Sequence, residues 1–270
     1  MEAAQGTGTG GFRVNKLRVL DLFSGIGGFS LGLERTGGFQ TVAFCEIEDF
    51  PRRVLAKHWP DVPCYRDVRE LTAERLATDG ITPIDVITGG FPCQDISTAG
   101  KQAGITEGTR SGLWSEIIRL ARDLRPRLIL VENVANLLAG PADRPGGWFG
   151  RVLGDLAACG YDAEWENIPA AAVGAPHPRE RVWIAAYPPQ ERYAGKVHGW
   201  HLQEGRREWE VSLPPRLLDA LRGTYCAADS YHIRDHDGFP TIMDRLSACG
   251  NAVVPQIPEL IGRAILEAIA

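Results

Sequence analysis

Short apolar runs alternate with helical stretches along the first half of the chain, and each run ends in glycine or a polar residue. The runs are Leu17 to Phe23, Val42 to Cys45, Ile84 to Thr88 and Leu128 to Val131. Such runs between amphipathic helices are typical of buried parallel strands joined by crossover helices. We therefore expect an α/β fold with a mostly parallel sheet, whose carboxyl edge gathers the polar residues that follow the runs.

The alternation stops after Ile184 and returns only in the amphipathic stretch Ile257 to Ile269. The intervening stretch is rich in proline, tryptophan and tyrosine and predicts irregular structure. The 270 residues divide into a flexible polar leader (1–16), a sheet domain (17–186), a small insertion (187–245) and a segment that returns to the sheet domain (246–270).

Composition excludes several classes of protein. Lys plus Arg number 29 against 34 Asp plus Glu, and a net charge of −5 is unusual for a protein that only coats nucleic acid, although a local basic groove remains compatible with it. No signal-peptide core or membrane-spanning run is visible. Without an export signal, the six cysteines indicate reduced thiols and a cytoplasmic location.

A glycine cluster, Ser24 to Gly28, follows the first run and predicts a nucleotide-binding turn. Glu46 lies 21 residues after Gly25, the spacing at which an acid binds ribose hydroxyls. Ser30 occupies the position of the third glycine of the dinucleotide fingerprint, which disfavours NAD and fits a nucleoside without phosphates, such as S-adenosylmethionine. Asp67 could meet the adenine amine. An ordinary tight turn would use the same glycines.

The turn Gly89 to Gln94 follows the third run and contains Pro92 and Cys93. Two glycines and a proline fix an unusual backbone path that would present Cys93 at the edge of the sheet. A buried structural cysteine is the common alternative. The turn favours a nucleophile, because a thiol is intrinsically nucleophilic and a core cysteine needs no such turn.

Taken together, the motifs make the chain resemble the cytosine-specific DNA methyltransferases that form 5-methylcytosine. The blocks appear in the order of that family across about residues 17 to 269: Asp21 to Gly28, Glu46, Gly90 to Gln94, Glu132 to Val134, Arg179 to Arg181 and Gly250 to Pro255. The resemblance implies a Rossmann-like fold that binds S-adenosylmethionine, with residues 187–245 as the target-recognition region.

The resemblance also implies a mechanism. Cys93 would add to carbon 6 of a cytosine flipped out of duplex DNA, and Glu132 would protonate ring nitrogen 3. Arg181 would hold the carbonyl oxygen of the base and brace Glu132, with Arg179 near the DNA backbone. The family usually has Gln two residues before the first arginine, where this chain has His177.

The resemblance also implies which residues bind the cofactor and which bind DNA. Phe23 would pack on the adenine, Ile47 on the ribose and Leu113 on the other face of the adenine, with Asn251 and Val253 near the methionine part. The cofactor set is Asp21, Phe23, Ser24, Gly25, Gly27, Gly28, Glu46, Ile47, Asp67, Pro92, Leu113, Asn251 and Val253. The DNA set is Gln94, Ser97, Lys101, Arg110, Arg206 and Arg207, with Ser97 to Gly112 as a lid.

The implied partner is double-stranded DNA, methylated by a monomer, with a cognate restriction endonuclease acting on the same site as a candidate partner. No metal is expected, because His198, His201, His232 and His236 lack a CxxC pair. A transfer-RNA cytosine-5 methyltransferase and a catalytically inactive nucleic-acid-binding relative stay open as alternatives. A nicotinamide oxidoreductase is disfavoured by Ser30.

Overall fold

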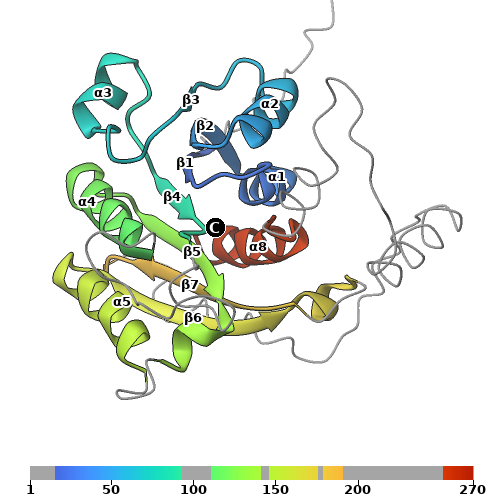
Figure 1. The fold of residues 1–270 in the computed structure, drawn as a ribbon, viewed down its shortest axis with the longest axis vertical. Helices are drawn as coiled ribbons and strands as arrows, with labels where there is room; N and C mark the ends of the chain where they lie inside the picture. The colour runs from blue at the N-terminus through green and yellow to red at the C-terminus, as the bar shows by residue number, and fades with distance from the viewer. Residues whose placement is uncertain (1–15, 93–110, 141–145, 176–178, 191–251, 270) are drawn as a thin grey trace, which may run out of the picture.

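A computed structural model describes residues 16–92, 111–140, 146–175, 179–190 and 252–269. In these residues a seven-stranded sheet has the order β3-β2-β1-β4-β5-β7-β6. Figure 1 shows the sheet between two groups of helices. The expectation of an α/β fold with a mostly parallel sheet is confirmed.

The parallel part of the sheet pairs β1 with β2 and β4, β2 with β3, and β4 with β5. These strands are β1 (Leu17–Leu22), β2 (Phe39–Cys45), β3 (Cys64–Tyr65), β4 (Val86–Gly89) and β5 (Leu128–Val134). Four of them overlap the apolar runs of the sequence, and the two-residue β3 ends two residues before Asp67. Their carboxyl ends meet at one edge.

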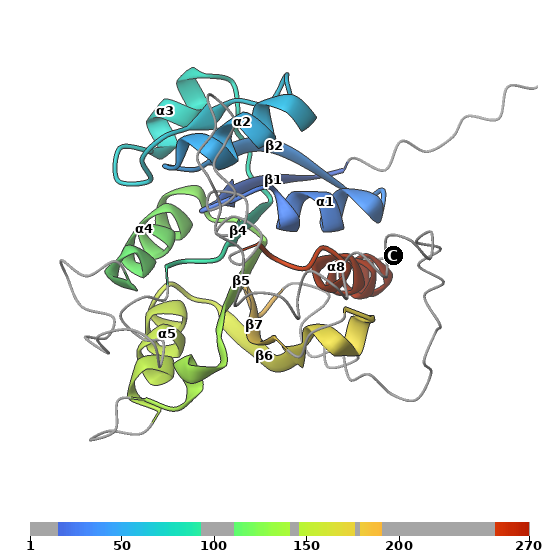
Figure 2. The ribbon, with the colours of Figure 1, turned by 45° about the vertical axis from the view of Figure 1, so that its right-hand side comes forward.

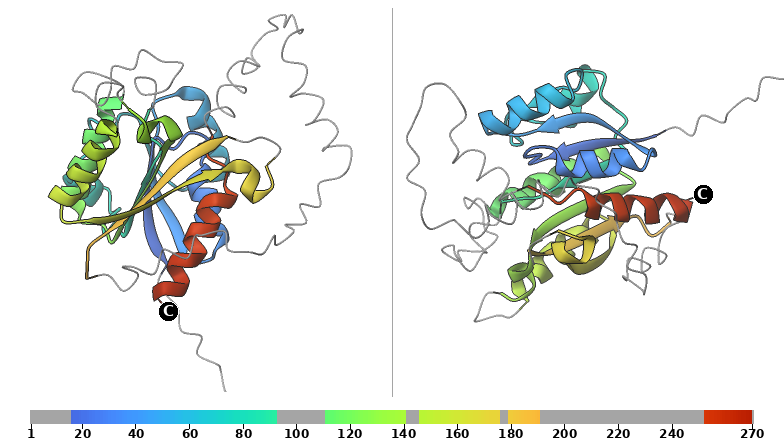
Figure 3. Two further views of the ribbon diagram at one scale, coloured as in Figure 1. Left: turned by 90° about the horizontal axis from the view of Figure 1, so that it is seen from below. Right: turned by 90° about the vertical axis from the view of Figure 1, so that its right-hand side faces the viewer.

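Helices cover both faces of the sheet (Figures 1 and 3). One core packs beneath α3, α4 and α5, and a second packs beneath α1 and α8. The helices are α1 (Gly28–Arg35), α2 (Asp49–His58), α3 (Ala73–Thr78), α4 (Trp114–Leu124), α5 (Gly147–Ala158) and α8 (Gln256–Ile269), with short 3-10 turns η1 (Ser111–Leu113), η2 (Ala135–Leu138) and η3 (Ala170–Val173).

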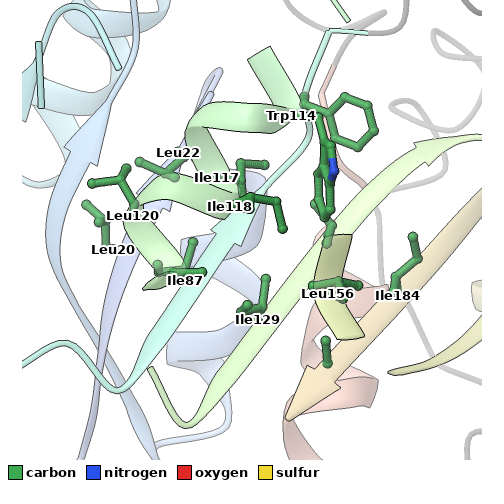
Figure 4. Close-up of a cluster of buried hydrophobic side chains, with 14 of the residues drawn as sticks. Leu20, Leu22, Ile87, Trp114, Ile117, Ile118, Leu120, Ile129, Leu156 and Ile184 are labelled. Carbon is green, nitrogen blue, oxygen red and sulfur yellow. The ribbon is translucent and has the colours of Figure 1, made fainter. Parts of the chain in front are cut away.

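Alternate residues of each strand enter opposite cores, which explains why the strands are apolar runs. Leu20 and Leu22 of β1 join the core under α4, whereas Leu17 and Val19 join the core under α1 and α8. Figure 4 shows the first core, where side chains of α4 such as Ile117 lie over the sheet. A strand buried on both faces needs no polar alternation.

Two antiparallel strands, β6 (Asp162–Pro169) and β7 (Glu180–Tyr187), extend the sheet beyond β5. The sequence analysis missed this hairpin, because β6 has a mixed polar pattern. The sequence analysis also predicted that the fourth strand ends at Val131, which is wrong. Pairing with β7 extends β5 to Val134, so Glu132 lies inside the strand.

The last helix, α8, packs against α1 near the beginning of the chain (Figure 2). The approach is close at Gly32, where an added Cβ would lie 2.2 Å from the Pro255 carbonyl oxygen and 2.7 Å from Pro258 Cγ. A glycine is therefore required here by backbone-to-backbone contact.

We expect Gly32→Ala to destabilise the protein by roughly 1–3 kcal/mol, the usual cost of overpacking, because α8 must shift away from α1. Gly154→Ala in α5 is the matched control, since its added Cβ meets nothing within 4 Å. There the change should stabilise by about 0.5–1 kcal/mol through helix propensity. Urea unfolding of both variants measures the difference, and equal stabilities would contradict the contact.

Parts of the predicted organisation lie outside the described residues. These are nearly all of the leader and of residues 187–245, and the domain division stays a prediction. Within the described part, no helix is both long and apolar enough to cross a bilayer.

Candidate active site

The loop after β1 has a backbone path that favours glycine. Gly25 has φ +52° and Gly27, at the start of α1, has φ +87°, both in the left-handed region. Phe23 also has a positive φ, 52°, which is uncommon for a bulky residue and indicates local strain held by its surroundings. Ser24 anchors the loop, because its hydroxyl donates to the Asp21 carbonyl at 2.6 Å and its N–H donates to the Cys45 carbonyl.

Glu46 follows β2 and faces this loop. Its Oε2 accepts from the Gly25 N–H and its Oε1 from the Glu48 N–H, both at 2.8 Å. Burial raises the pKa of Glu46, and the two backbone hydrogen bonds oppose that shift. Ile47, the next residue, is apolar and 54% exposed. The structure therefore brings together the residues expected to bind a ribose.

Asp67 follows β3, on the far side of β2 from the glycine loop. The Arg69 Nε donates to Asp67 Oδ1 at 2.9 Å, and hydrogen bonding to Arg69 holds the pKa of Asp67 below its usual range. The sequence analysis did not foresee this ion pair.

Leu113, at the start of α4, is half-buried against the core under α4.

A buried carboxyl group, Asp21, lies beneath the loop. The Ser30 hydroxyl donates to Oδ2 and the Thr88 hydroxyl to Oδ1, each at 2.7 Å. Ser30 is the residue in place of the third fingerprint glycine, and it fastens α1 to β1 here. Burial raises the pKa of Asp21 from 3.8 to about 7, against the hydrogen bonds from Ser30 and Thr88.

This shift predicts a dependence of stability on pH. Because folding raises the pKa of Asp21, the folded protein keeps a proton that the unfolded chain loses between about pH 4 and pH 7. Stability from this group is therefore present at low pH and falls as pH rises through that window. The asparagine in Asp21→Asn cannot titrate. The free energy of unfolding of the wild type, measured with urea, should therefore fall by a few kcal/mol relative to that of the variant between pH 4.5 and pH 7.5. Parallel pH curves would contradict the shift.

The segment before α8 packs against the start of α1. An added Cβ at Gly28 would lie 2.5 Å from the Val253 carbonyl oxygen, which places Val253 beside the glycine loop. On another side, the Trp59 ring would lie 2.7 Å from a Cβ at Gly27, and the Trp59 Nε1 donates to Glu34. Trp59 thus braces the loop without having been predicted.

The turn after β4 lies against Glu132 of the neighbouring strand. An added Cβ at Gly90 would lie 3.3 Å from Glu132 Oε2. The Asn133 Nδ2 donates to the Phe91 carbonyl at 3.0 Å, and both groups are buried. Glu132 and Asn133 therefore contact the residues that lead, through the half-buried Pro92, to Cys93 in the chain.

Glu132 and Arg181 form a partly buried ion pair, with Arg181 Nε 3.0 Å from Glu132 Oε1. Burial raises the pKa of Glu132, while Arg181 and Arg179 lower it. The net upward direction makes the carboxyl a proton donor closer to neutral pH than an exposed glutamate would be. Arg179 begins the approach to β7 with an unusual φ of +20°.

Several predicted residues lie outside the described part of the chain. They are Cys93, Gln94, Ser97, Lys101, Arg110, His177, Arg206, Arg207 and Asn251, and the lid and the four histidines of the rejected zinc site lie there too. Among the residues that are described, no group of three His, Cys, Asp or Glu side chains is placed to hold a metal ion.

Comparisons with known proteins agree on one family. A family model described as C-5 cytosine-specific DNA methylase matches residues 17–214. The chain is 35% identical over 196 residues to the type II methyltransferase M.Sau3AI of Staphylococcus aureus, covering 67% of this chain and 46% of that protein. It is 35% identical over 174 residues to M2.BsuMI of Bacillus subtilis, covering 63% of this chain and 42% of that one.

A solved structure from an E. coli prophage, described as a DNA modification methyltransferase, matches with a TM-score of 0.53 and 30% identity. The match covers 64% of this chain and 47% of that chain. The chain thus spans less than half the length of these relatives.

Proposed function

The chain belongs to the C-5 cytosine-specific DNA methylase family, and from that premise we propose that it transfers a methyl group from S-adenosylmethionine to carbon 5 of a flipped-out cytosine in duplex DNA. The observation that carries the proposal is the contact of Glu132 with both Arg181 and the turn that leads to Cys93. A proton donor and a thiol from adjacent strands are what addition to a pyrimidine requires.

The cofactor side fits S-adenosylmethionine by its chemistry. Glu46 and Asp67 follow the carboxyl ends of the adjacent strands β2 and β3, where carboxylate oxygens suit hydroxyl and amine donors rather than phosphates. Glu46 is held by two backbone N–H groups, so its remaining lone pairs can accept from ribose hydroxyls. Ile47 offers apolar surface to the adenosine. When bound, the cofactor supplies an electrophilic methyl group.

The chain's own residues activate the base. The Cys93 thiolate forms a bond to carbon 6, and the electron pair of the 5,6 double bond becomes available at carbon 5 as Glu132 gives its proton to nitrogen 3. Arg181, which pairs with Glu132, stabilises the developing charge on the base and the Glu132 carboxylate that remains after the proton has been given up. After carbon 5 has accepted the methyl group, loss of its proton to a base expels the thiolate and restores the ring.

Covalent trapping tests this proposal. The protein is incubated with S-adenosylmethionine and a random-sequence duplex library that carries 5-fluorocytosine, then separated on a denaturing gel. Fluorine cannot leave as a proton does, so we expect a DNA–protein adduct that survives denaturation and depends on the cofactor.

A parallel arm with 5-fluorocytosine-substituted transfer RNA separates the alternatives. An adduct on transfer RNA and none on DNA would replace the DNA substrate by RNA. Cofactor binding with no adduct on either substrate would support the inactive relative and overturn the proposal.

A further inference from the structure

Arg52, in the first turn of α2, connects the ends of two strands at the cofactor side of the site. Its Nη1 donates to the Glu46 carbonyl at 3.0 Å and to the Tyr65 carbonyl at 2.9 Å, and lies 3.3 Å from the Cys64 sulfur. The side chain is half-buried. One guanidinium nitrogen therefore joins the residue after β2 to the last residue of β3.

The backbone ladder at this point is short. β3 contains two residues and pairs with β2 only through Phe44 with Cys64 and Cys45 with Tyr65. Two backbone bonds flank this ladder: the Phe44 N–H donates to the Pro63 carbonyl at 2.9 Å, and the Glu46 N–H donates to the Tyr65 carbonyl at 3.0 Å. The Glu46 carbonyl lies outside the ladder and accepts from Arg52 instead.

Arg52 acts on the main chain of Glu46, whereas the carboxylate of Glu46 accepts from Gly25 and Glu48. The main chain of Glu46 is thus held on both sides, at its N–H and at its carbonyl, and the side chain is held at both carboxylate oxygens. Hydrogen bonds from a guanidinium are stronger than neutral ones, because the donor is charged.

We propose that Arg52 is a positioning residue that fixes the Glu46 carboxylate against the glycine loop and thereby sets the affinity for the adenosine part of the cofactor. The inference rests on the proposed function, because it assigns Glu46 to the ribose. Lysine keeps the positive charge, but its shorter side chain would have to bring one ammonium to the place that Arg52 Nη1 occupies, so it should restore part of the effect.

The experiment measures the dissociation constant of S-adenosylhomocysteine by calorimetry, without DNA. Arg52→Gln should raise it roughly tenfold to a hundredfold, the range of a lost charge-assisted hydrogen bond, and Arg52→Lys should give an intermediate value. Arg53→Gln is the matched control. Arg53 is the exposed neighbour, stacked over Phe50 at 5.8 Å, and its loss should leave binding unchanged.

A double-mutant cycle separates positioning from a general loss of stability. With Glu46→Ala already present, Arg52→Gln should weaken binding far less than it does in wild type, because the carboxylate to be positioned is gone. The inference would be overturned if the two substitutions raised the dissociation constant by factors that simply multiply in the double variant. It would also be overturned if Arg52→Gln left the dissociation constant at the wild-type value. If Arg52→Gln does not fold, the same cycle with Arg52→Lys decides. Absence of binding by wild type would instead defeat the proposed function.

Discussion

Replacing Glu132 by glutamine should reduce methyl transfer by about 10²- to 10⁴-fold, the range for loss of a general acid. Glutamine keeps the shape of the side chain, but it has no proton to give to ring nitrogen 3. Because Glu132 contacts Gly90 and Arg181 rather than the glycine loop, binding of S-adenosylhomocysteine should stay within about twofold of wild type. Single-turnover transfer of a tritiated methyl group and calorimetry measure the two quantities.

The sheet offers a matched control for Glu132. Glu132 of β5 and Glu166 of β6 both pair in register with Trp183 of β7, from opposite sides. Glu166→Gln makes the same chemical change in the same row of the sheet, away from the turn that leads to Cys93. It should retain wild-type transfer. Equal rates for the two variants would remove Glu132 from the proposed chemistry.

The parts of the fold that the sequence predicted are those with local signals. Leu17 to Leu22 is apolar apart from Arg18 and Asp21 because it is buried on both faces. Gly25 and Gly27 after it have positive φ. The hairpin of β6 and β7 has no such signal, since β6 mixes polar and apolar residues: its Trp165 is exposed, whereas Glu164 and Glu166 are partly buried. Its recognition depends on pairing with β5, which is a property of the folded sheet.

The residues of the candidate site fall into the same two groups, those with a local signal in the sequence and those without one. Glu46 and Glu132 were predicted because each follows or ends an apolar run. Arg52 and Asn133 were not, because each acts on a main-chain carbonyl that is distant in sequence, and any residue could supply that carbonyl. Ser30 was noted as a departure from a fingerprint, but its bond to Asp21 required the orientation of α1 on β1.

The largest effect is expected at Cys93, which no other thiol in the proposed mechanism can replace. Cys93→Ala should abolish both methyl transfer and the covalent adduct with 5-fluorocytosine DNA, a loss of at least about 10⁴-fold when a nucleophile is removed. Binding of S-adenosylhomocysteine should persist, because the carboxylates and the glycine loop are unchanged. Transfer assays, denaturing gels and calorimetry on one preparation measure all three.

Cys159→Ala is the control that separates this chemistry from a general need for thiols. Cys159 is buried at the end of α5, where its sulfur accepts from Arg122 Nε at 3.3 Å, and it should affect stability rather than transfer. Asn133 and Glu132 contact the residues just before Cys93. The substitution Asn133→Ala removes the hydrogen bond to the Phe91 carbonyl but leaves the thiol in place. It should therefore lower the rate of adduct formation. A Cys93→Ala protein that still methylates DNA would require another nucleophile, and the contact between Glu132 and this turn would then have no part in addition to the base.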